Sequence, residues 1–152
     1  MTPSDPSIDA LPIGPDGVAA LIPHSGAMRL IDQVVSAAGE EVVCTTRTHL
    51  SPDNPLRVNG ALPASAAIEY AAQAMAVHAA LSRGGPPRRG FLVVASGVAW
   101  TADRLDQGDS TMEIRATRLA STGLGAQYAF DLSAGPGVQV TGTLTLSLEA
   151  ET

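Results

Sequence analysis

The chain has 152 residues, of which 45% are hydrophobic and 3% aromatic, and it carries a formal net charge of −6. This length suits one domain, the hydrophobic content excludes a disordered chain, and the acidic balance argues against nucleic acid as a partner. A single cysteine excludes an internal disulfide framework and a cysteine-based zinc site, and we expect neither a metal nor another cofactor.

The first residues combine prolines with Ser and Asp, and they lack the basic and apolar stretches of a secretion signal. We therefore expect a cytoplasmic protein in which residues 1–14 form a flexible lead-in and residues 15–152 form one domain. A short helix is predicted over residues 15–22. The segment 23–28 is a turn that presents one imidazole, and an apolar strand-like run follows over residues 29–35.

Val and Thr residues predict a strand over residues 41–49. The alanine-rich segment 59–82 predicts a long helix that is apolar on nearly all sides, as buried helices are. A break rich in Gly, Pro and Arg follows the helix, and beyond it short turns separate the remaining strands, which favours an antiparallel meander. These strands are predicted over residues 91–100, 111–120, 125–133 and 138–148.

One long apolar helix with five or six mostly antiparallel strands predicts an α+β fold. Because the helix is apolar on most sides, it needs cover on most sides. A strongly curved sheet would supply most of that cover, and a second subunit would supply the rest. We therefore predict the hotdog fold, in which a curved antiparallel sheet wraps around one long central helix.

The three histidines differ in their expected surroundings. His78 lies nine positions after Glu69, which places these two side chains on opposite sides of one helix. His49 ends a strand beside a turn, where we expect a solvated surface position. His24 follows a proline in a turn with free backbone groups, so it is the candidate base, although a histidine in a turn more often has no catalytic role.

Glu69 is the one acidic residue of the alanine-rich helix. A carboxylate there is either a paired structural group or a functional one. Gln73 lies beside it one turn later, and no Lys or Arg occurs at the spacings that pair charges along a helix. This pattern favours a desolvated carboxyl that keeps its proton, as a general acid must. With an imidazole base, such an acid suits proton removal α to a carbonyl and protonation of a β-hydroxyl leaving group.

Three blocks of the sequence resemble the small β-hydroxyacyl-acyl-carrier-protein dehydratases of bacterial fatty acid synthesis. The block I-P-H-S-G-A-M-R-L-I-D-Q-V (22–34) resembles the family's leucine-proline-histidine loop and its L-x-D-x-V. The block L-P-A-S-A-A-I-E-Y-A-A-Q (62–73) resembles M-P-G-V-L-x-x-E-A-x-A-Q. The run from Val98 to Asp109 resembles the strand and P-G-D turn after the family's helix. The resemblance extends over nearly the whole chain.

The resemblance implies a dimer with active sites at the subunit interface, the histidine coming from one subunit and the acid from the other. His24 would remove the C2 proton of a 3-hydroxyacyl thioester, and Glu69 would protonate the departing hydroxyl to leave the trans-2-enoyl product. The N–H of Ala64, at the family's glycine position, would bind the thioester carbonyl at the helix start. Pro63 and Gln73 would complete the substrate-binding residues.

The segment before the helix departs from the family pattern. P-L-R-V-N-G (55–60) replaces a glycine-histidine-phenylalanine-proline-glycine stretch, and Ala66 and Ala67 stand where bulkier aliphatic residues are usual. These changes would reshape the acyl tunnel and leave the chemistry in place. The segment is similar to a divergent branch of dehydratases encoded with aryl polyene pathways, which implies either a homodimer or a heterodimer with a second hotdog protein.

Four arginines are candidates for docking the acyl carrier protein: Arg83, Arg88 and Arg89 after the helix, and Arg104 further along. An acidic carrier protein needs a basic surface on a partner whose own net charge is −6. The alternative is that the arginines after the helix only offset the dipole at its C-terminus and aid solubility.

Two other functions remain open. A hotdog thioesterase would share the fold and an acid in the helix, would not require the Pro-His loop, and would release free thiol from an acyl thioester. A non-catalytic hotdog subunit of a heterodimeric dehydratase would leave His24 and Glu69 dispensable for turnover. The alanine-rich helix is a poor candidate for a membrane span, because three polar side chains interrupt it.

Overall fold

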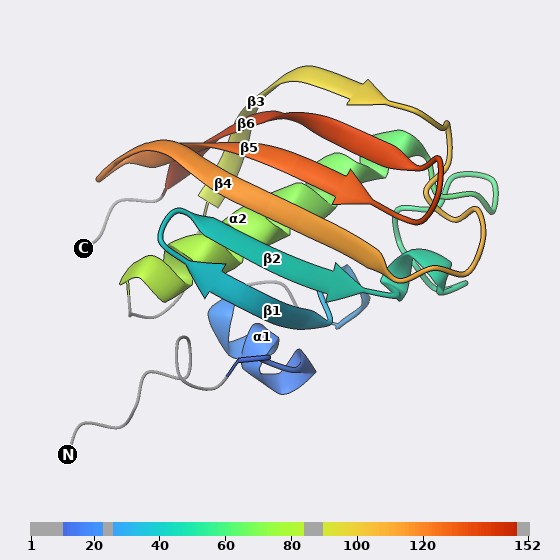
Figure 1. Cartoon of the computed structure of the whole chain (residues 1–152), viewed down its shortest axis with the longest axis horizontal. Helices are drawn as coiled ribbons and strands as arrows, with labels where there is room; N and C mark the ends of the chain where they lie inside the picture. The colour runs from blue at the N-terminus through green and yellow to red at the C-terminus, as the bar shows by residue number, and fades with distance from the viewer. Residues whose placement is uncertain (1–10, 23–25, 84–89, 149–152) are drawn as a thin grey trace.

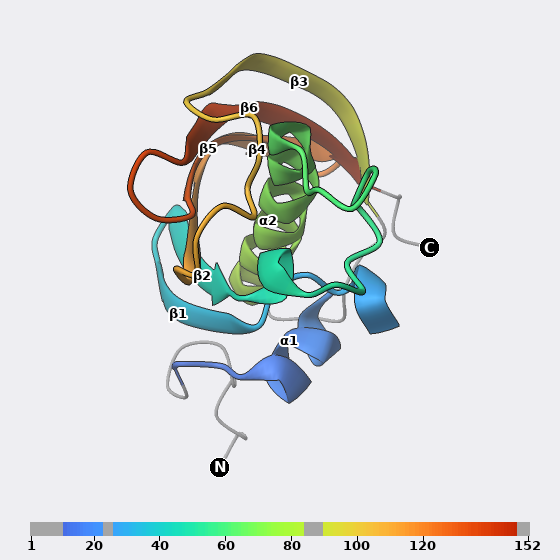
Figure 2. The same ribbon diagram turned by 90° about the vertical axis from the view of Figure 1, so that its right-hand side faces the viewer.

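The computed structural model describes residues 11–22, 26–83 and 90–148 of the chain. A six-stranded antiparallel sheet curves around the helix α2 (Ala67–Arg83), and the short helix α1 (Pro15–Leu21) packs against α2 and the first strand (Figure 1). Viewed from the end, the strands enclose α2 on several sides (Figure 2). This is the predicted α+β arrangement.

The order of the strands in the sheet differs from the predicted meander. The sheet order is β1-β2-β4-β5-β6-β3, so consecutive pairing holds for β4, β5 and β6, whereas β3 pairs with β6 at the sheet edge and not with β4. The connection over residues 101–111 therefore crosses from the edge of the sheet to its middle. The strand bounds are β1 Gln33–Ala38, β2 Glu41–Thr46, β3 Gly90–Trp100, β4 Met112–Thr122, β5 Gly125–Ser133 and β6 Gln139–Leu148.

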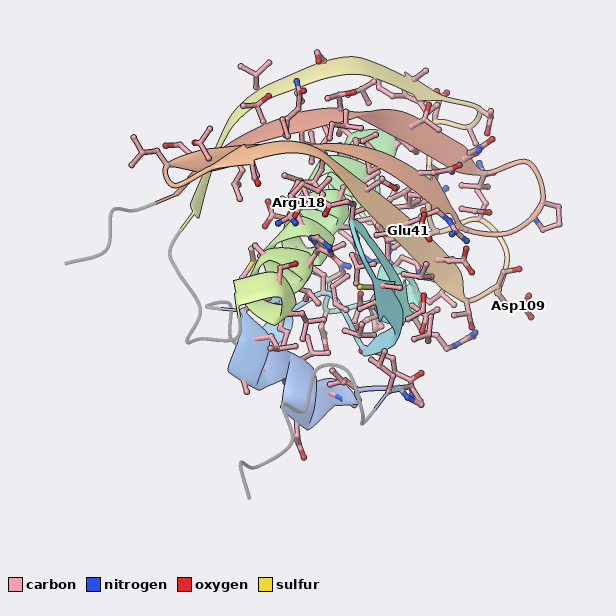
Figure 3. All side chains as sticks on the ribbon, turned by 60° about the vertical axis from the view of Figure 1, so that its left-hand side comes forward. Glu41, Asp109 and Arg118 are labelled. Carbon is pink, nitrogen blue, oxygen red and sulfur yellow. The ribbon has the colours of Figure 1, made fainter. Side chains whose placement is uncertain are left out.

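Small side chains let the sheet approach α2 closely. Ala67, Ala71 and Ala74 are fully buried in the core, and side chains fill the space between the sheet and α2 (Figure 3). The opposite stripe of the helix, which includes Ile68 and Ala72, is only half-buried. Among the described helices, including α2, none is long and apolar enough to cross a membrane.

The folded part of the chain begins before the predicted boundary at residue 15. Ile13 and Val34 exchange two backbone hydrogen bonds of 2.9 Å each, and Ile13 is buried. The flexible lead-in predicted for residues 1–14 is therefore wrong for the residues around Ile13, while residues 1–10 lie outside the described residues.

Two histidines are buried within the fold. His78 accepts a hydrogen bond from the Tyr128 hydroxyl at its Nδ1 (2.6 Å) and donates one from Nε2 to the Gly39 carbonyl (2.9 Å). His49, predicted at the surface, is 1% exposed and donates from Nε2 to the Ser110 carbonyl at 2.9 Å. That prediction was wrong because the β3–β4 connection covers the end of β2, a contact between distant segments of the chain.

Acidification should destabilise the protein through His49 and His78. Burial lowers the pKa of both imidazoles in the fold, so below about pH 6.5 the unfolded chain binds protons that the folded chain does not. The free energy of unfolding should therefore fall as the pH drops through that range, by up to about 1.4 kcal/mol per pH unit for each histidine. Urea unfolding at about pH 7.5 and pH 5.5 measures this loss.

A double variant, His49→Gln with His78→Gln, is the matched control for this measurement. Glutamine keeps an amide donor for the carbonyl partners and does not titrate. The stability of the variant should change less between the two pH values than that of the original chain. Equal losses in both proteins would assign the acid sensitivity to other groups.

Candidate functional site

The start of α2 is held by the connection that follows β3. Ala64 donates its N–H to the Asp103 carbonyl at 2.8 Å, and Leu105 donates its N–H to the Leu62 carbonyl at 2.9 Å. The residues just before α2 are thus paired with a part of the chain about 40 positions further along. This pairing places the helix start relative to the sheet.

The amide that was predicted to bind the thioester carbonyl is therefore already bonded. Ala64 is buried, and its N–H can serve a substrate only if it gives up the Asp103 carbonyl. The first amides of a helix have no intrahelical acceptor, so the N–H of the exposed Ser65 is the next candidate at the same helix start. Pro63 precedes both residues and pairs with Arg104 in an isolated β-bridge.

Glu69 lies in the first turn of α2, and its side chain is half-buried. It stands beside the half-buried stripe of Ile68, Ala72 and Ala76, so one carboxyl borders a largely apolar helix face. His78 lies on the side of α2 that faces β5, in agreement with the prediction that it shares no site with Glu69. The candidate acid is thus on a part of α2 that the described residues cover incompletely.

Gln73 anchors the loop before β1 to α2. Its Oε1 accepts a hydrogen bond from the Leu30 N–H at 2.8 Å, and its Nε2 donates to the Met28 carbonyl at 2.6 Å. The side chain is fully buried, and its bond to the Leu30 N–H is buried with it. Gln73 was predicted as a substrate-binding residue; that role stays a prediction, and the bonds observed are to the backbone of this loop.

The candidate base His24 lies outside the described residues. The chain on either side is held in place, because Ile22 is buried and Leu30 is bonded to Gln73. Gln73 is one helical turn beyond Glu69. The same two turns of α2 therefore carry the candidate acid and anchor the segment that follows the candidate base.

A buried polar network that sequence reasoning missed supports the same loop. The Leu30 carbonyl accepts hydrogen bonds from the hydroxyls of Thr46 (2.6 Å) and Thr48 (2.7 Å). Thr48 also contacts the hydroxyl of Tyr70 at 2.8 Å, and Asn54 donates to that hydroxyl at 2.9 Å. The only signal in the sequence is the presence of polar side chains in predicted strand and helix positions, which does not identify their partners.

Of the four arginines predicted to dock a carrier protein, the structure places the backbone of two, Arg83 and Arg104, at opposite ends of α2. Arg104 pairs with Pro63 at the start of α2, whereas Arg83 is the last residue of that helix, about 25 Å further along at 1.5 Å per residue. Arg88 and Arg89 lie outside the described residues. The docking role of each arginine, and of the four as one surface, stays a prediction.

A family model described as ApeP-like, ApeP dehydratase, matches residues 17–150. A solved structure described as the dehydratase heterocomplex ApeI:P from Xenorhabdus doucetiae is similar at 26% identity, with 93% of each chain covered and a TM-score of 0.76. No curated protein matches the sequence.

More distant structures show the fold alone. A hypothetical thioesterase from Streptococcus pneumoniae, solved with coenzyme A, is 14% identical and covers 78% of this chain and 85% of its own, with a TM-score of 0.55. A homologue of HP0420 from Helicobacter felis is 10% identical over 88% of both chains, with a TM-score of 0.59. The predicted hotdog fold is confirmed.

Gln73→Leu should destabilise the protein, because leucine keeps the side-chain volume and leaves the Leu30 N–H and the Met28 carbonyl without their partner. We expect the free energy of unfolding to fall by about 2–4 kcal/mol. Urea unfolding measures the change. Gln33→Leu, at the exposed start of β1, is the matched control and should change stability by less than about 0.5 kcal/mol. Equal effects of the two substitutions would contradict the anchoring role.

Proposed function

The chain belongs to the ApeP-like dehydratase family, and on that premise we propose that it converts a 3-hydroxyacyl thioester on an acyl carrier protein to the trans-2-enoyl thioester. The observation that carries the proposal is the joint position of Glu69 and Gln73 on α2. The carboxyl borders a half-buried apolar stripe, and the amide one turn later anchors the segment after His24.

The proposed reaction divides acid and base work between two groups. The imidazole of His24 takes the C2 proton, and the electrons of that C–H bond form the new C2=C3 double bond. Glu69 gives its proton to the 3-hydroxyl, which leaves as water, since hydroxide is a poor leaving group. The proton then held by the imidazole replaces the one lost by the carboxyl, and the site is restored.

Negative charge develops on the thioester oxygen as the C2 proton is removed. A backbone N–H at the start of α2 is suited to this charge, because the helix dipole is positive there. The proposed donor is the Ala64 N–H if the Asp103 carbonyl is displaced, or else the neighbouring Ser65 N–H. The proposed substrate is of the fatty acid or aryl polyene type, which the match to the ApeP-like dehydratases supports.

A second hotdog subunit is the proposed partner. The structure described as the ApeI:P heterocomplex contains two different components, which supports a heterodimer, and a second copy of this chain is the alternative. β3 is at the edge of the described sheet, and its Val94 and Trp100 are 48% and 49% exposed. The half-buried stripe of α2 likewise leaves apolar surface for another subunit to cover.

Replacing either acid–base group should abolish most of the dehydration. His24→Ala and Glu69→Gln should each lower kcat by about 10²–10⁴-fold, because each removes a positioned proton carrier. The assay follows enoyl absorbance with a carrier-bound 3-hydroxyacyl substrate and the assembled protein. Glu113→Gln, whose side chain is 53% exposed on β4, is the matched control and should retain full activity.

The same assay separates the alternative functions. Near-normal dehydration by both site variants in the assembled enzyme would identify this chain as a non-catalytic subunit. Release of free thiol without an enoyl product would identify a thioesterase. Equal kcat/KM for carrier-bound and pantetheine-bound substrates would remove the acyl carrier protein from the proposal.

The protein should sediment as a dimer, either alone or with a second hotdog subunit. The expected cause is burial of the β3 edge and of the half-buried stripe on α2. Sedimentation velocity at micromolar concentration, with and without the candidate partner, measures the assembly. A monomer under both conditions would contradict the shared active site.

A further inference from the structure

We propose that Arg57 is a positioning residue, which holds the start of α2 in place by binding Asp106 and the loops on either side. Arg57 belongs to the P-L-R-V-N-G segment that departs from the family pattern and that the proposed chemistry does not use. The consequence for turnover rests on the proposed function, because it requires that the helix start bind the thioester. The positional role itself does not.

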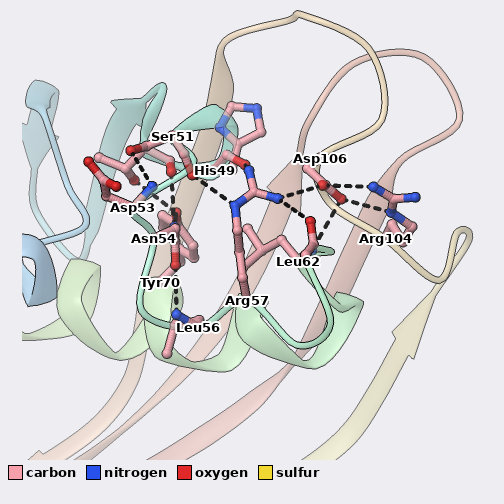
Figure 4. Close-up of polar contacts among 12 residues, drawn as sticks. His49, Ser51, Asp53, Asn54, Leu56, Arg57, Leu62, Tyr70, Arg104 and Asp106 are labelled. Atoms are coloured by element: carbon pink, nitrogen blue, oxygen red, sulfur yellow. Dashed lines mark hydrogen bonds and ion pairs between the residues drawn. The ribbon is translucent and has the colours of Figure 1, made fainter.

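The guanidinium of Arg57 bonds three separate parts of the chain (Figure 4). Its Nε donates to the Ser51 carbonyl at 2.8 Å, and one Nη donates to the His49 carbonyl at 3.1 Å. The other Nη donates to the Gly60 carbonyl at 3.0 Å and to Asp106 Oδ2 at 2.8 Å. The side chain is only 15% exposed, so these bonds are largely shielded from water.

A tight turn brings Gly60 within reach of Arg57. Val58 and Ala61 exchange backbone hydrogen bonds of 2.7 and 3.1 Å across Asn59 and Gly60. Both turn residues have positive φ, 53° and 80°, as a type I′ turn requires and as an Asn-Gly pair favours. The turn reverses the chain immediately before Leu62, so the Arg57–Gly60 bond ties the guanidinium to the approach to α2.

Asp106 passes this constraint to the helix start. Its Oδ1 accepts a hydrogen bond from the Leu62 N–H at 3.3 Å, and its other oxygen binds Arg57. Arg104 approaches the same carboxylate from the exposed side, at 3.0 and 2.9 Å. Hydrogen bonding by Arg104, and next by Arg57 and the Leu62 N–H, lowers the pKa of Asp106, so the carboxylate stays charged at any working pH.

Arginine is suited to this position because four divergent bonds require a planar group with several fixed donors. A lysine ammonium would keep the charge and could not reach all of these carbonyls at once. The Asp106 carboxylate bonds both Arg57 and the N–H of Leu62, and Leu62 is two residues before Ala64. A shift of this carboxylate would therefore move the backbone amides at the helix start, where a small displacement weakens the binding of charge that develops during the reaction.

The test compares Arg57→Met with the matched control Arg115→Met in the full chain, assembled with its partner where one is required. Arg115 is a surface arginine whose side chain is 47% exposed and pairs with Glu41 and Glu113 on the sheet. Amide hydrogen exchange is measured at Leu62 and Ala64, and kcat and KM are measured per folded molecule. Arg57→Lys is the second variant, which tests the same contacts if Arg57→Met does not fold.

Arg57→Met should speed exchange at Leu62 and Ala64 by roughly ten- to a hundredfold, with Arg57→Lys in between and the control unchanged. It should lower kcat about tenfold or more while KM changes by less than about threefold, because the lost interaction acts on the transition state. In an Asp106→Asn background the same substitution should have much less effect, since the two residues act together.

Unchanged exchange in Arg57→Met and Arg57→Lys would overturn the proposal. Faster exchange with unchanged kcat per folded molecule would reduce Arg57 to a purely stabilising residue and would also overturn it. A wild-type protein without dehydratase activity would contradict the proposed function instead, and the exchange measurement would then decide the positional role by itself.

Discussion

The polar side chains of α2 are the constraint on which the rest of the structure depends. A helix enclosed by a sheet cannot leave a polar group without a partner, because a buried group that loses its hydrogen bond costs about 1–3 kcal/mol. Tyr70, Gln73 and His78 lie on this helix at 0%, 0% and 2% exposure. Each is hydrogen-bonded to a different segment outside the helix, so these side chains hold the surrounding loops against α2. The buried alanines of α2 pack against the sheet.

Two of these three side chains bond segments next to the candidate site residues. Tyr70 bonds Thr48 and Asn54, near the turn that leads to the helix start. Gln73 bonds the backbone on the far side of the candidate base, and His78 bonds the β1–β2 hairpin. The candidate acid Glu69 lies on the same helix, beside the half-buried apolar stripe of α2. The proposed proton transfer uses a carboxyl in this position.

Local pattern was sufficient to predict the helix and most of the strands, because alanine favours helices and Val and Thr favour strands wherever they lie. The resemblance added the family, which the family match confirms, and a candidate site. Neither the local pattern nor the resemblance predicted the contacts between distant segments of the chain. The bond from Ala64 to Asp103, the burial of His49 under Ser110 and the separation of Arg104 from Arg83 all depend on the crossing of the β3–β4 connection. Nothing within residues 101–111 indicates where that connection crosses.

The place of β3 in the sheet also bears on the order in which the chain can fold during synthesis. β3 is made before β4 and β5, and its described partner β6 is made after them, so pairing of β3 with β6 must wait until all three later strands have been made. Until then β3 is a strand with both edges unpaired, a state in which association with other chains is a hazard. The β4–β5 hairpin can form earlier, from neighbouring segments. Pairing of β3 with β6 therefore completes the described sheet, and the same step forms the sheet edge at which a partner could bind.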